Sequence, residues 1–405
     1  MSLKWKISTI GELCSKVSSG GTPKTTNDLY YGGSIPWLNT KEINFNRIYD
    51  TERHITQYGF ENSAAKWVKK DSVIVAMYGA TAAKVAMNMV DLTTNQACCN
   101  LTIDESLANP KFVYYYLYNN YERLLNLASG AAQQNLNSNI IKDFLINIPS
   151  LDVQNKIANI LSVIDDKIEI NKKINRNLKA QLETIYNSFF VYYDYFSKED
   201  LEECEIGLIP KNWDLKSLGE VTTKINEKVG DRNYKVFSAV NTGNLILSEE
   251  YFDKQVFSKS IEKYIVVKQK EFAYNPARIN IGSIGRNDFD YDGCVSPVYV
   301  AFKVEEGYEN FMNMYIKSNR FNQWVVTLSS GSVRQTLNYN DFSIIKIAYP
   351  PKDLVNKFNR VYENFYEVIN YNNSVIVNLE KIRDILLPKL MSGEIDVSQI
   401  NCDLE

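Results

Sequence analysis

The chain has 405 residues, more than one ordinary hydrophobic core holds, so we expect two or more domains. Hydrophobic residues make up 45% and charged residues 23%, and no stretch reaches the roughly 18 apolar residues of a membrane span, which predicts a soluble protein without membrane contact. The net charge of -3 excludes a protein that binds nucleic acid by bulk positive charge, so any DNA contact must come from local patches or be shared with a partner.

The start of the chain, Met1–Lys6, lacks the apolar run and the cleavage site of a secretory signal, so we expect a cytoplasmic location. The cysteines are scattered without Cys-x-x-Cys spacing, which is typical of reduced, mostly buried thiols and not of a disulfide framework or a zinc site. They are Cys14, Cys98, Cys99, Cys204, Cys294 and Cys402.

Residues 1–149 are predicted to form a mixed α/β domain. Short β-rich runs such as Ser72–Met77 alternate with turns rich in Gly, Asn and Pro. The clearest helical stretch is Pro110–Leu127.

Residues 150–198 are predicted to form a long helix, because apolar residues recur there at alternating spacings of four and three. Ten successive positions fit a heptad, and only two of them are polar, which predicts a coiled-coil-like stripe. The stripe consists of Ile157, Leu161, Ile164, Ile168, Asn171, Asn175, Leu178, Leu182, Ile185 and Phe189.

Residues 199–349 are interpreted as a second mixed domain, with a strand at Val295–Phe302 and a helix at Phe311–Leu328. Residues 350–405 are predicted to form a second long helix with its own heptad stripe. That stripe consists of Phe358, Tyr362, Phe365, Ile369, Asn372, Ile376, Leu379, Arg383, Leu386 and Leu390.

An internal repeat relates the two halves. Gly130–Asn139 aligns with Gly331–Asn340, 201 residues later, and Trp5–Glu12 resembles Trp213–Glu220, 208 residues later. Residues that serve a common scaffold should match between the halves. The matching residues are therefore interpreted first as caps or braces of the loop before each helix; they are Gln134, Leu136 and Asn137 in the first half and Gln335, Leu337 and Asn338 in the second.

The fold class that follows is mixed α/β, with two globular domains separated by two long helices in a pseudo-two-fold repeat. We expect the helices to run antiparallel, with Asn171 and Asn372 facing one another to fix the register. Each helical stripe is about 50 Å long, and one turn of B-DNA is about 34 Å, so the pair is long enough to act as a ruler between two reading domains. The alternative that each helix packs on its own globular domain stays open.

Three segments resemble the specificity subunit of type I restriction-modification systems: Leu386–Ile395, Ile206–Trp213 with the following Leu218–Glu220, and Ile148–Lys156. The resemblance covers essentially the whole chain. It departs at Val153, where the family usually has Glu before Gln154.

The resemblance implies two target recognition domains, 1–149 and 199–349, each reading one half of a bipartite, asymmetric site on double-stranded DNA. The helical regions 150–198 and 350–405 would set the gap and dock two modification subunits, and restriction subunits would join the complex. S-adenosylmethionine, ATP and Mg²⁺ are expected on those partner subunits and no cofactor on this chain.

No catalytic constellation is found in the sequence, so we expect no enzymatic activity. Tyr274–Arg278 lacks the second proline and the aromatic residue of an adenine methyltransferase turn, and no P-loop occurs. His54 is the only histidine, and the aspartates of Asp165–Lys167 are expected to be solvated charges and not nuclease ligands. Two alternatives remain at this stage, a coiled-coil scaffold protein and a fragment of a single-chain methyltransferase-nuclease.

Polar loops that differ between the halves are the best candidates for DNA contact, because the two domains would read different bases. Lysines can neutralise phosphates, whereas arginine and asparagine have the donors to read guanine and adenine. The candidates are Thr22, Lys24, Thr25, Asn39, Lys41, Tyr78, Thr81 and Lys84 in the first half, and Asn241, Thr242, Arg278, Asn280, Ser283, Arg286 and Arg334 in the second.

Overall fold

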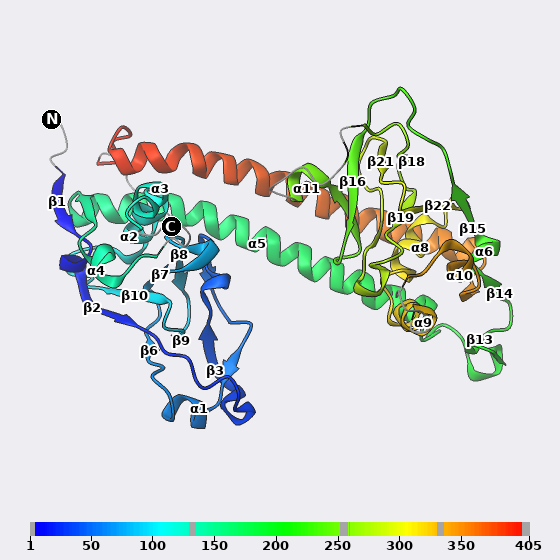
Figure 1. Cartoon of the computed structure of the whole chain (residues 1–405), viewed down its shortest axis with the longest axis horizontal. Coiled ribbons are helices and arrows are strands. Elements are labelled where there is room, and N and C mark those ends of the chain that lie inside the picture. Colours follow the sequence, from blue (N-terminus) through cyan, green and yellow to red (C-terminus); the bar gives the residue numbers. More distant parts are fainter. Residues whose placement is uncertain (1–4, 129–134, 252–257, 259, 330–335, 399–405) are drawn as a thin grey trace. The chain divides into compact units, whose positions relative to one another are not determined.

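The computed structural model describes residues 5–128, 135–251, 258, 260–329 and 336–398. It divides into two compact units, one made of Met1–Lys172 and Asn373–Glu405 and the other of Lys173–Asn372. The division crosses both long helices, α5 (Leu151–Phe190) and α11 (Lys352–Ser392), so each unit contains one globular part and a segment of each helix (Figure 1).

The globular part of the first unit is built from a two-stranded, a five-stranded and a four-stranded sheet, with the strand orders β1-β11, β2-β10-β7-β8-β4 and β5-β3-β9-β6. The short helices are α1 (Gln57–Glu61), α2 (Pro110–Asn119), α3 (Tyr121–Leu125) and α4 (Ser138–Lys142). The strands are β1 (Lys6–Thr9), β2 (Cys14–Ser19), β3 (Tyr31–Leu38), β4 (Asn46–Ile48), β5 (His54–Ile55), β6 (Trp67–Val68), β7 (Val73–Ala76), β8 (Val85–Asn88), β9 (Leu92–Thr94), β10 (Cys98–Ile103) and β11 (Leu145–Ile148).

The globular part of the second unit contains a two-stranded hairpin, β12-β13, and three further sheets with the orders β14-β23, β15-β22-β19-β20 and β17-β16-β21-β18. Its short helices are α6 (Leu218–Val221), α7 (Ser248–Tyr251), α8 (Glu309–Tyr315), α9 (Asn319–Ser329) and α10 (Tyr339–Ser343). Its strands are β12 (Leu201–Cys204), β13 (Gly207–Pro210), β14 (Asp214–Ser217), β15 (Thr222–Ile225), β16 (Lys235–Val240), β17 (Asn244–Leu247), β18 (Ile265–Val267), β19 (Phe272–Tyr274), β20 (Ile284–Arg286), β21 (Gly293–Val295), β22 (Val300–Val304) and β23 (Lys346–Tyr349).

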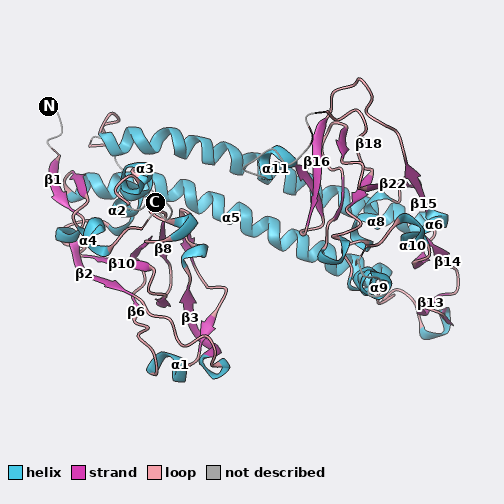
Figure 2. Cartoon of the chain, viewed as in Figure 1, coloured by secondary structure: helices cyan, strands magenta, loops and turns pink. Residues whose placement is uncertain are grey.

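The two globular parts share one topology, which confirms the repeat predicted from the sequence. The order β2-β10-β7-β8 corresponds to β15-β22-β19-β20, and β5-β3-β9-β6 corresponds to β17-β16-β21-β18. In both parts the same single pair of the second sheet is parallel, β3 with β9 and β16 with β21. Figure 2 shows the mixture of strands and short helices in each part, so the predicted mixed α/β class is confirmed.

The matching residues hold matching structural positions. The Leu136 amide donates to the Met77 carbonyl at 2.9 Å, and the Leu337 amide donates to the Pro276 carbonyl at 3.0 Å. Asn137 caps α4 by accepting bonds from the Asn139 and Ile140 amides, and Asn338 caps α10 in the same way. The interpretation of these leucines and asparagines as braces and caps is confirmed, whereas Gln134 and Gln335 lie outside the described residues.

The two long helices follow the predicted heptad stripes. All ten stripe positions of α5 and all ten of α11 are buried or half-buried. In the first unit Asp165 of α5 pairs with Arg383 of α11 and Lys172 with Glu380, and in the second unit Asn175 of α5 pairs with Asn372 of α11. In the second unit the Tyr186 ring of α5 also contacts the Phe358 ring of α11. Residue numbers rise along one helix as they fall along the other, so the helices run antiparallel in each unit, as predicted.

The predicted pairing of Asn171 with Asn372 is wrong. Asn372 donates to the side-chain oxygen of Asn175 at 2.8 Å, and Asn171 instead donates to the Lys167 carbonyl of its own helix at 2.7 Å. The antiparallel register brings Asn175, the stripe position of α5 that follows Asn171, opposite Asn372. The sequence supplied two candidate asparagines on α5, and spacing alone does not choose between them.

Three predicted elements are divided in the structure. The expected strand at Val295–Phe302 is split into β21 and β22, because Pro297 has no amide hydrogen for a sheet and the chain turns between Ser296 and Tyr299. The expected helix over residues 110–127 breaks at Asn120 into α2 and α3, and the one over residues 311–328 becomes α8 and α9.

Each long helix packs on a globular part in addition to the other helix, so the alternative in which packing on its own globular domain takes the place of the helix pair is wrong. Tyr186 and Phe190 of α5 contact Phe311 of α8 in the second unit, with ring centroids 6.1 and 5.0 Å apart. Both rings also contact Phe358 of α11. Within the described part of the chain, no helix has the length and apolar character that crossing a membrane requires.

Candidate nucleic-acid interface

In the first globular part the loop between β7 and β8 is a strained, well-braced turn. Gly79 and Ala83 adopt the left-handed region with φ of 77° and 65°, and the short helix η4 (Gly79–Thr81) lies between them. The Ala83 amide closes the turn by donating to the Ala76 carbonyl at 2.9 Å. Strained backbone held by surrounding structure is frequent at functional sites, and here it presents Tyr78, whose residue is 41% exposed.

The loop that carries the candidates Asn39 and Lys41 lies directly against this turn. The Thr81 hydroxyl donates to the Thr40 carbonyl at 3.0 Å, and the Lys84 ammonium donates to the Asn44 side chain at 2.7 Å. Asn39 accepts the Lys41 amide and caps a short helix, η3 (Thr40–Glu42). The structure therefore brings the candidates Asn39, Thr81 and Lys84 into one surface.

Lys41 and Thr22 have partners within the protein. The Lys41 ammonium forms an ion pair with Glu52, and the Thr22 hydroxyl bonds to the Gln96 side chain. Lys24 and Thr25 are exposed on the same loop as Thr22. Gln96, which sequence reasoning missed, is held at the interface by Thr22.

The second globular part builds the same turn between β19 and β20. Asn275 accepts the Ala277 amide at 3.0 Å, and the short helix η6 (Ile279–Ile281) ends at Gly282, whose φ is 85°. Arg278 is exposed at the start of η6, and Asn280 is half-buried within it. The turn is thus the structural counterpart of Tyr78–Lys84.

The candidate residues Asn241 and Thr242 lie beside this turn. A Cβ added to Gly282 would lie 2.9 Å from the Asn241 carbonyl, and one added to Gly285 would lie 2.5 Å from Asn244 backbone. Only residues without a side chain permit such a close approach. Asn241, Thr242 and Arg278 are all exposed, so they form the second candidate surface.

Two predicted DNA contacts in the second half are placed inside the protein. Ser283 is 3% exposed, and its hydroxyl donates to the Ala239 carbonyl at 2.6 Å. Arg286 is 6% exposed, and its guanidinium donates to Asp288, to Asn310 at 2.7 Å and to the Tyr362 hydroxyl at 3.2 Å. We correct both assignments, because a buried group whose donors are already used cannot reach a base edge. Arg334 lies outside the described residues.

Comparisons with known proteins indicate the family. A family model described as the type I restriction modification DNA specificity domain matches residues 2–180. The type I restriction enzyme MjaIX specificity subunit of Methanocaldococcus jannaschii is 27% identical, over 98% of this chain and 94% of its own length. The HindI specificity subunit of Haemophilus influenzae is 22% identical, over 96% and 99%. The chain is thus similar to type I restriction-modification specificity subunits over nearly its whole length.

A solved structure supports the fold of the chain. The crystal structure of a type I restriction-modification system S subunit from M. genitalium covers 96% of both chains with a TM-score of 0.56 at 17% sequence identity. The chain therefore has a fold that is already known from a solved structure.

The cysteines of the specificity subunit are free thiols within the described residues. Cys98, Cys99 and Cys294 are buried, and Cys14 and Cys204 are half-buried. Burial raises the pKa of Cys14, Cys99 and Cys294 to about 12, so these thiols stay protonated at neutral pH. In the part of the chain that the structure describes, no three His, Cys, Asp or Glu side chains cluster as metal ligands would.

Asp165 of the specificity subunit is not the solvated charge that the sequence predicted. It is 8% exposed, accepts the Tyr115 hydroxyl at 2.6 Å and pairs with Arg383 at 3.1 Å. The neighbouring Asp166 pairs with Arg47 of β4, whose side chain is 5% exposed. Tyr115 and Arg47 belong to the first globular part, so the two carboxylates join that part to α5. Asp165 and the side chain of Arg47 are both buried, and a buried charge needs a partner of opposite charge.

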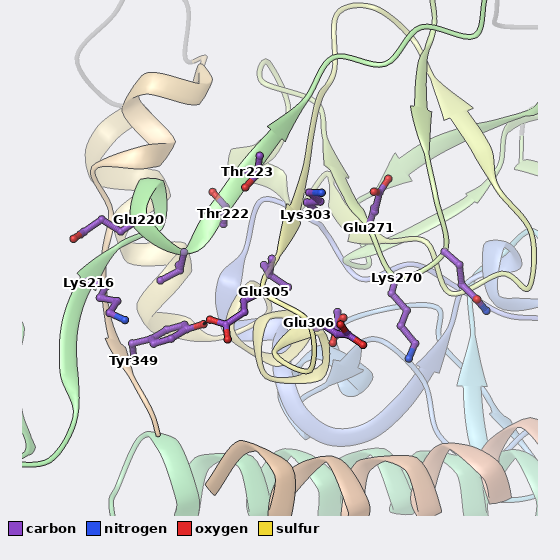
Figure 3. Close-up of a pocket in the computed structure, with 14 residues that line it drawn as sticks. Lys216, Glu220, Thr222, Thr223, Lys270, Glu271, Lys303, Glu305, Glu306 and Tyr349 are labelled. Carbon is purple, nitrogen blue, oxygen red and sulfur yellow. Dashed lines mark hydrogen bonds between the residues drawn. The ribbon is translucent and has the colours of Figure 1, made fainter. Parts of the chain in front are cut away.

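Two hollows on the specificity subunit differ in charge. The one on the second globular part has a volume of about 540 Å³ and is lined by Lys216, Lys270 and Lys303 but also by five glutamates (Figure 3). The glutamates are Glu220, Glu271, Glu305, Glu306 and Glu309. An excess of carboxylates repels DNA phosphates, so this hollow is a poor nucleic-acid surface.

The hollow on the first globular part has a volume of about 730 Å³ and is lined by lysines, serines and small residues without a carboxylate. The lining residues are Lys16, Val17, Ser18, Ser19, Gly20, Ala64, Lys66, Ser138 and Lys142. Sequence reasoning singled out the nearby Thr22, Lys24 and Thr25 but missed the lysines of the hollow, because the chain brings them together from positions up to 126 residues apart.

Proposed function

We propose that this specificity subunit reads a bipartite, asymmetric site on double-stranded DNA, one half through residues 1–149 and the other through residues 199–349. We name these two parts the first and second target recognition domains. The observation that carries the proposal is a repeated scaffold with unlike loops. Both domains place a braced turn at the same position, yet one turn presents Tyr78, Thr81 and Lys84 and the other presents Arg278 and Asn280.

The chemistry of these loops suits base and phosphate contacts. The paired donors of the Arg278 guanidinium match the O6 and N7 acceptors of guanine, and the side-chain amide of an asparagine matches N6 and N7 of adenine. Lys24 and Lys84 are suited to phosphate contact. Unlike side chains on equal scaffolds would read unlike half-sites, which is why the recognised sequence would be asymmetric.

We further propose that the helical regions 150–198 and 350–405 set the gap between the half-sites and dock two modification subunits. Apolar residues outside the helix-helix stripe support this. In the first unit Val163 and Ile170 of α5 and Ile382 and Ile385 of α11 are 46 to 61% exposed. In the second unit Ile174, Val368 and Tyr371 are 42 to 69% exposed. Exposed apolar residues on a helix are typical of protein interfaces.

In this proposal the specificity subunit is not itself an enzyme and works in the cytoplasm with its partners. S-adenosylmethionine-dependent adenine methylation would belong to the modification subunits. Restriction subunits would add ATP- and Mg²⁺-dependent translocation and cleavage. This division of labour follows from the family resemblance and from the lack of catalytic motifs in the sequence.

Domain exchange tests the proposal. Residues 199–349 are replaced by the corresponding domain of another specificity subunit, the chain is produced with its modification subunits, and methylated adenines are sequenced. The proposal predicts that one half of the methylated motif changes while the other half stays. An unchanged motif would favour the coiled-coil scaffold, and methylation by the purified chain alone would favour a single-chain methyltransferase.

A further inference from the structure

The basic hollow of the first target recognition domain has lysines that are free to bind an anion. Lys16 and Lys66 are exposed and Lys142 is half-buried, and within the described residues none of the three ammonium groups forms an ion pair. Lys41 of the same domain, by contrast, is neutralised by Glu52. Three unpaired cations around one concave surface attract anionic ligands.

The floor of the hollow offers neutral hydrogen-bond donors beside the lysines. Ser18 and Ser19 lie on β2, which is the edge strand of its five-stranded sheet, so one side of its backbone is unpaired in that sheet. Ser138 at the start of α4 lines the same hollow. Serine hydroxyls and backbone amides are common donors to DNA phosphates.

The backbone at one end of this floor is fixed by close packing. A Cβ added to Gly20 would lie 1.9 Å from the Thr94 carbonyl, so only glycine fits there. The next amide, of Gly21, donates to the same carbonyl at 2.9 Å. The chain therefore passes from the hollow at Gly20 through this fixed backbone directly into the candidate loop with Thr22 and Lys24.

We propose that this hollow binds backbone phosphates of the duplex next to the half-site read by the first target recognition domain. The lysines supply affinity that does not depend on sequence, and the loops beside them supply the base readout. The inference rests on the proposed function and deepens it, because it names the surface that positions the duplex.

The equivalent place in the second target recognition domain is built differently. Ser343 packs on Gly219 there as Lys142 packs on Gly11, so a serine replaces one lysine. Tyr339 stands in the position of Ser138, and Lys224, the counterpart of Lys16, lies over the Tyr339 ring at 5.6 Å. Within the described residues, this grouping of lysines thus occurs in the first domain and not at its counterpart in the second, so in this proposal the two domains hold DNA by different means.

The test is the salt dependence of DNA binding by the complex of this chain with its modification subunits. One variant carries Lys16→Ala, Lys66→Ala and Lys142→Ala. A matched control carries Lys69→Ala, Lys70→Ala and Lys224→Ala, which removes the same charge from exposed positions outside the hollow. Each phosphate contact steepens the fall of log affinity with log salt by about one, so the hollow variant should lower that slope by about 3 and the control by much less.

Sequence preference separates this inference from the proposed function. The hollow variant should bind the methylated motif and an unrelated duplex more weakly by the same factor, and replacement of the three lysines by arginine should restore binding. A slope equal to that of the control, or a changed methylation motif in the hollow variant, would overturn the inference and leave the proposed function standing. A wild-type complex that prefers no duplex would overturn the proposed function itself.

Discussion

The side-chain amide of Asn372 donates a hydrogen bond to the side-chain oxygen of Asn175 at 2.8 Å, and both residues are buried between the antiparallel helices of the second unit. A buried polar pair in an apolar stripe lowers stability relative to leucine but disfavours other registers, since a shifted helix would leave both amides without partners. The length and register of the helix pair are the quantities that would define the gap between half-sites.

The single variant Asn372→Leu is expected to lower the free energy of unfolding by about 1–3 kcal/mol, because it removes a donor from the buried Asn175 oxygen. The double variant Asn175→Leu with Asn372→Leu should recover most of this loss. Chemical denaturation of both variants measures the coupling. If the double variant lost as much stability as the two single variants together, the two asparagines would not act as a unit.

Arg286→Ala is expected to destabilise the second target recognition domain by about 2–3 kcal/mol, because the three hydrogen bonds of a buried guanidinium are lost together. Arg278→Ala, on the exposed turn nearby, should leave stability within about 0.5 kcal/mol and relax the second half-site instead. Thermal unfolding and methylation sequencing separate the two effects. The assignment fails if Arg286→Ala changes the motif of a fully folded protein.

Changes in the first turn should affect the other half-site. Thr81→Ala combined with Lys84→Ala removes the contacts that join this turn to Thr40 and Asn44. We expect the variant complex to tolerate base changes in the first half of the motif but not in the second half. Binding to a set of duplexes with single base substitutions measures this. Altered preference in both halves would contradict separate reading by the two domains.

Stability at acid pH should depend on a pair of glutamates that the repeat places alike. Hydrogen bonds from the Thr9 amide and the Ser8 hydroxyl lower the pKa of Glu12, and those from Ser217 lower the pKa of Glu220. A lowered folded-state pKa stabilises the fold above about pH 4.5, and this contribution is lost as the pH falls through the lowered value. Glu12→Gln and Glu220→Gln should therefore unfold at lower denaturant concentration than wild type at pH 7.

The difference between these glutamate variants and the wild type should shrink as the pH falls below about 4.5 and through the lowered pKa values of the two carboxyl groups. Glu105→Gln, at an exposed turn after β10, serves as the control for the loss of one charge. A gap between variant and wild type that is as wide at pH 3 as at pH 7 would refute the assignment to ionisation.

Much of the fold was predictable because short-range sequence patterns indicate it. The heptad spacing from Ile157 to Phe189 indicates a long helix, and α5 contains that whole stretch. Matching motifs around Leu136 and Leu337 predict one scaffold used twice, and the two amide bonds to Met77 and Pro276 confirm it.

The errors concern features that depend on contacts between distant residues. Arg286 and Ser283 look like loop donors in the sequence, but β16 and the residues around Tyr362 bury them. Asp165 is likewise buried through Tyr115 and Arg383, which lie 50 and 218 residues away. The lysines of the basic hollow were missed for the same reason, since no local pattern joins Lys16 to Lys142.

The most direct measurement of the central claim is the sequencing of methylated adenines in cells that carry this specificity subunit with its modification subunits. Two different half-sites at one fixed separation are the predicted result, because unlike domains are joined by helices of fixed length. A continuous motif, two identical half-sites or a variable separation would contradict the account.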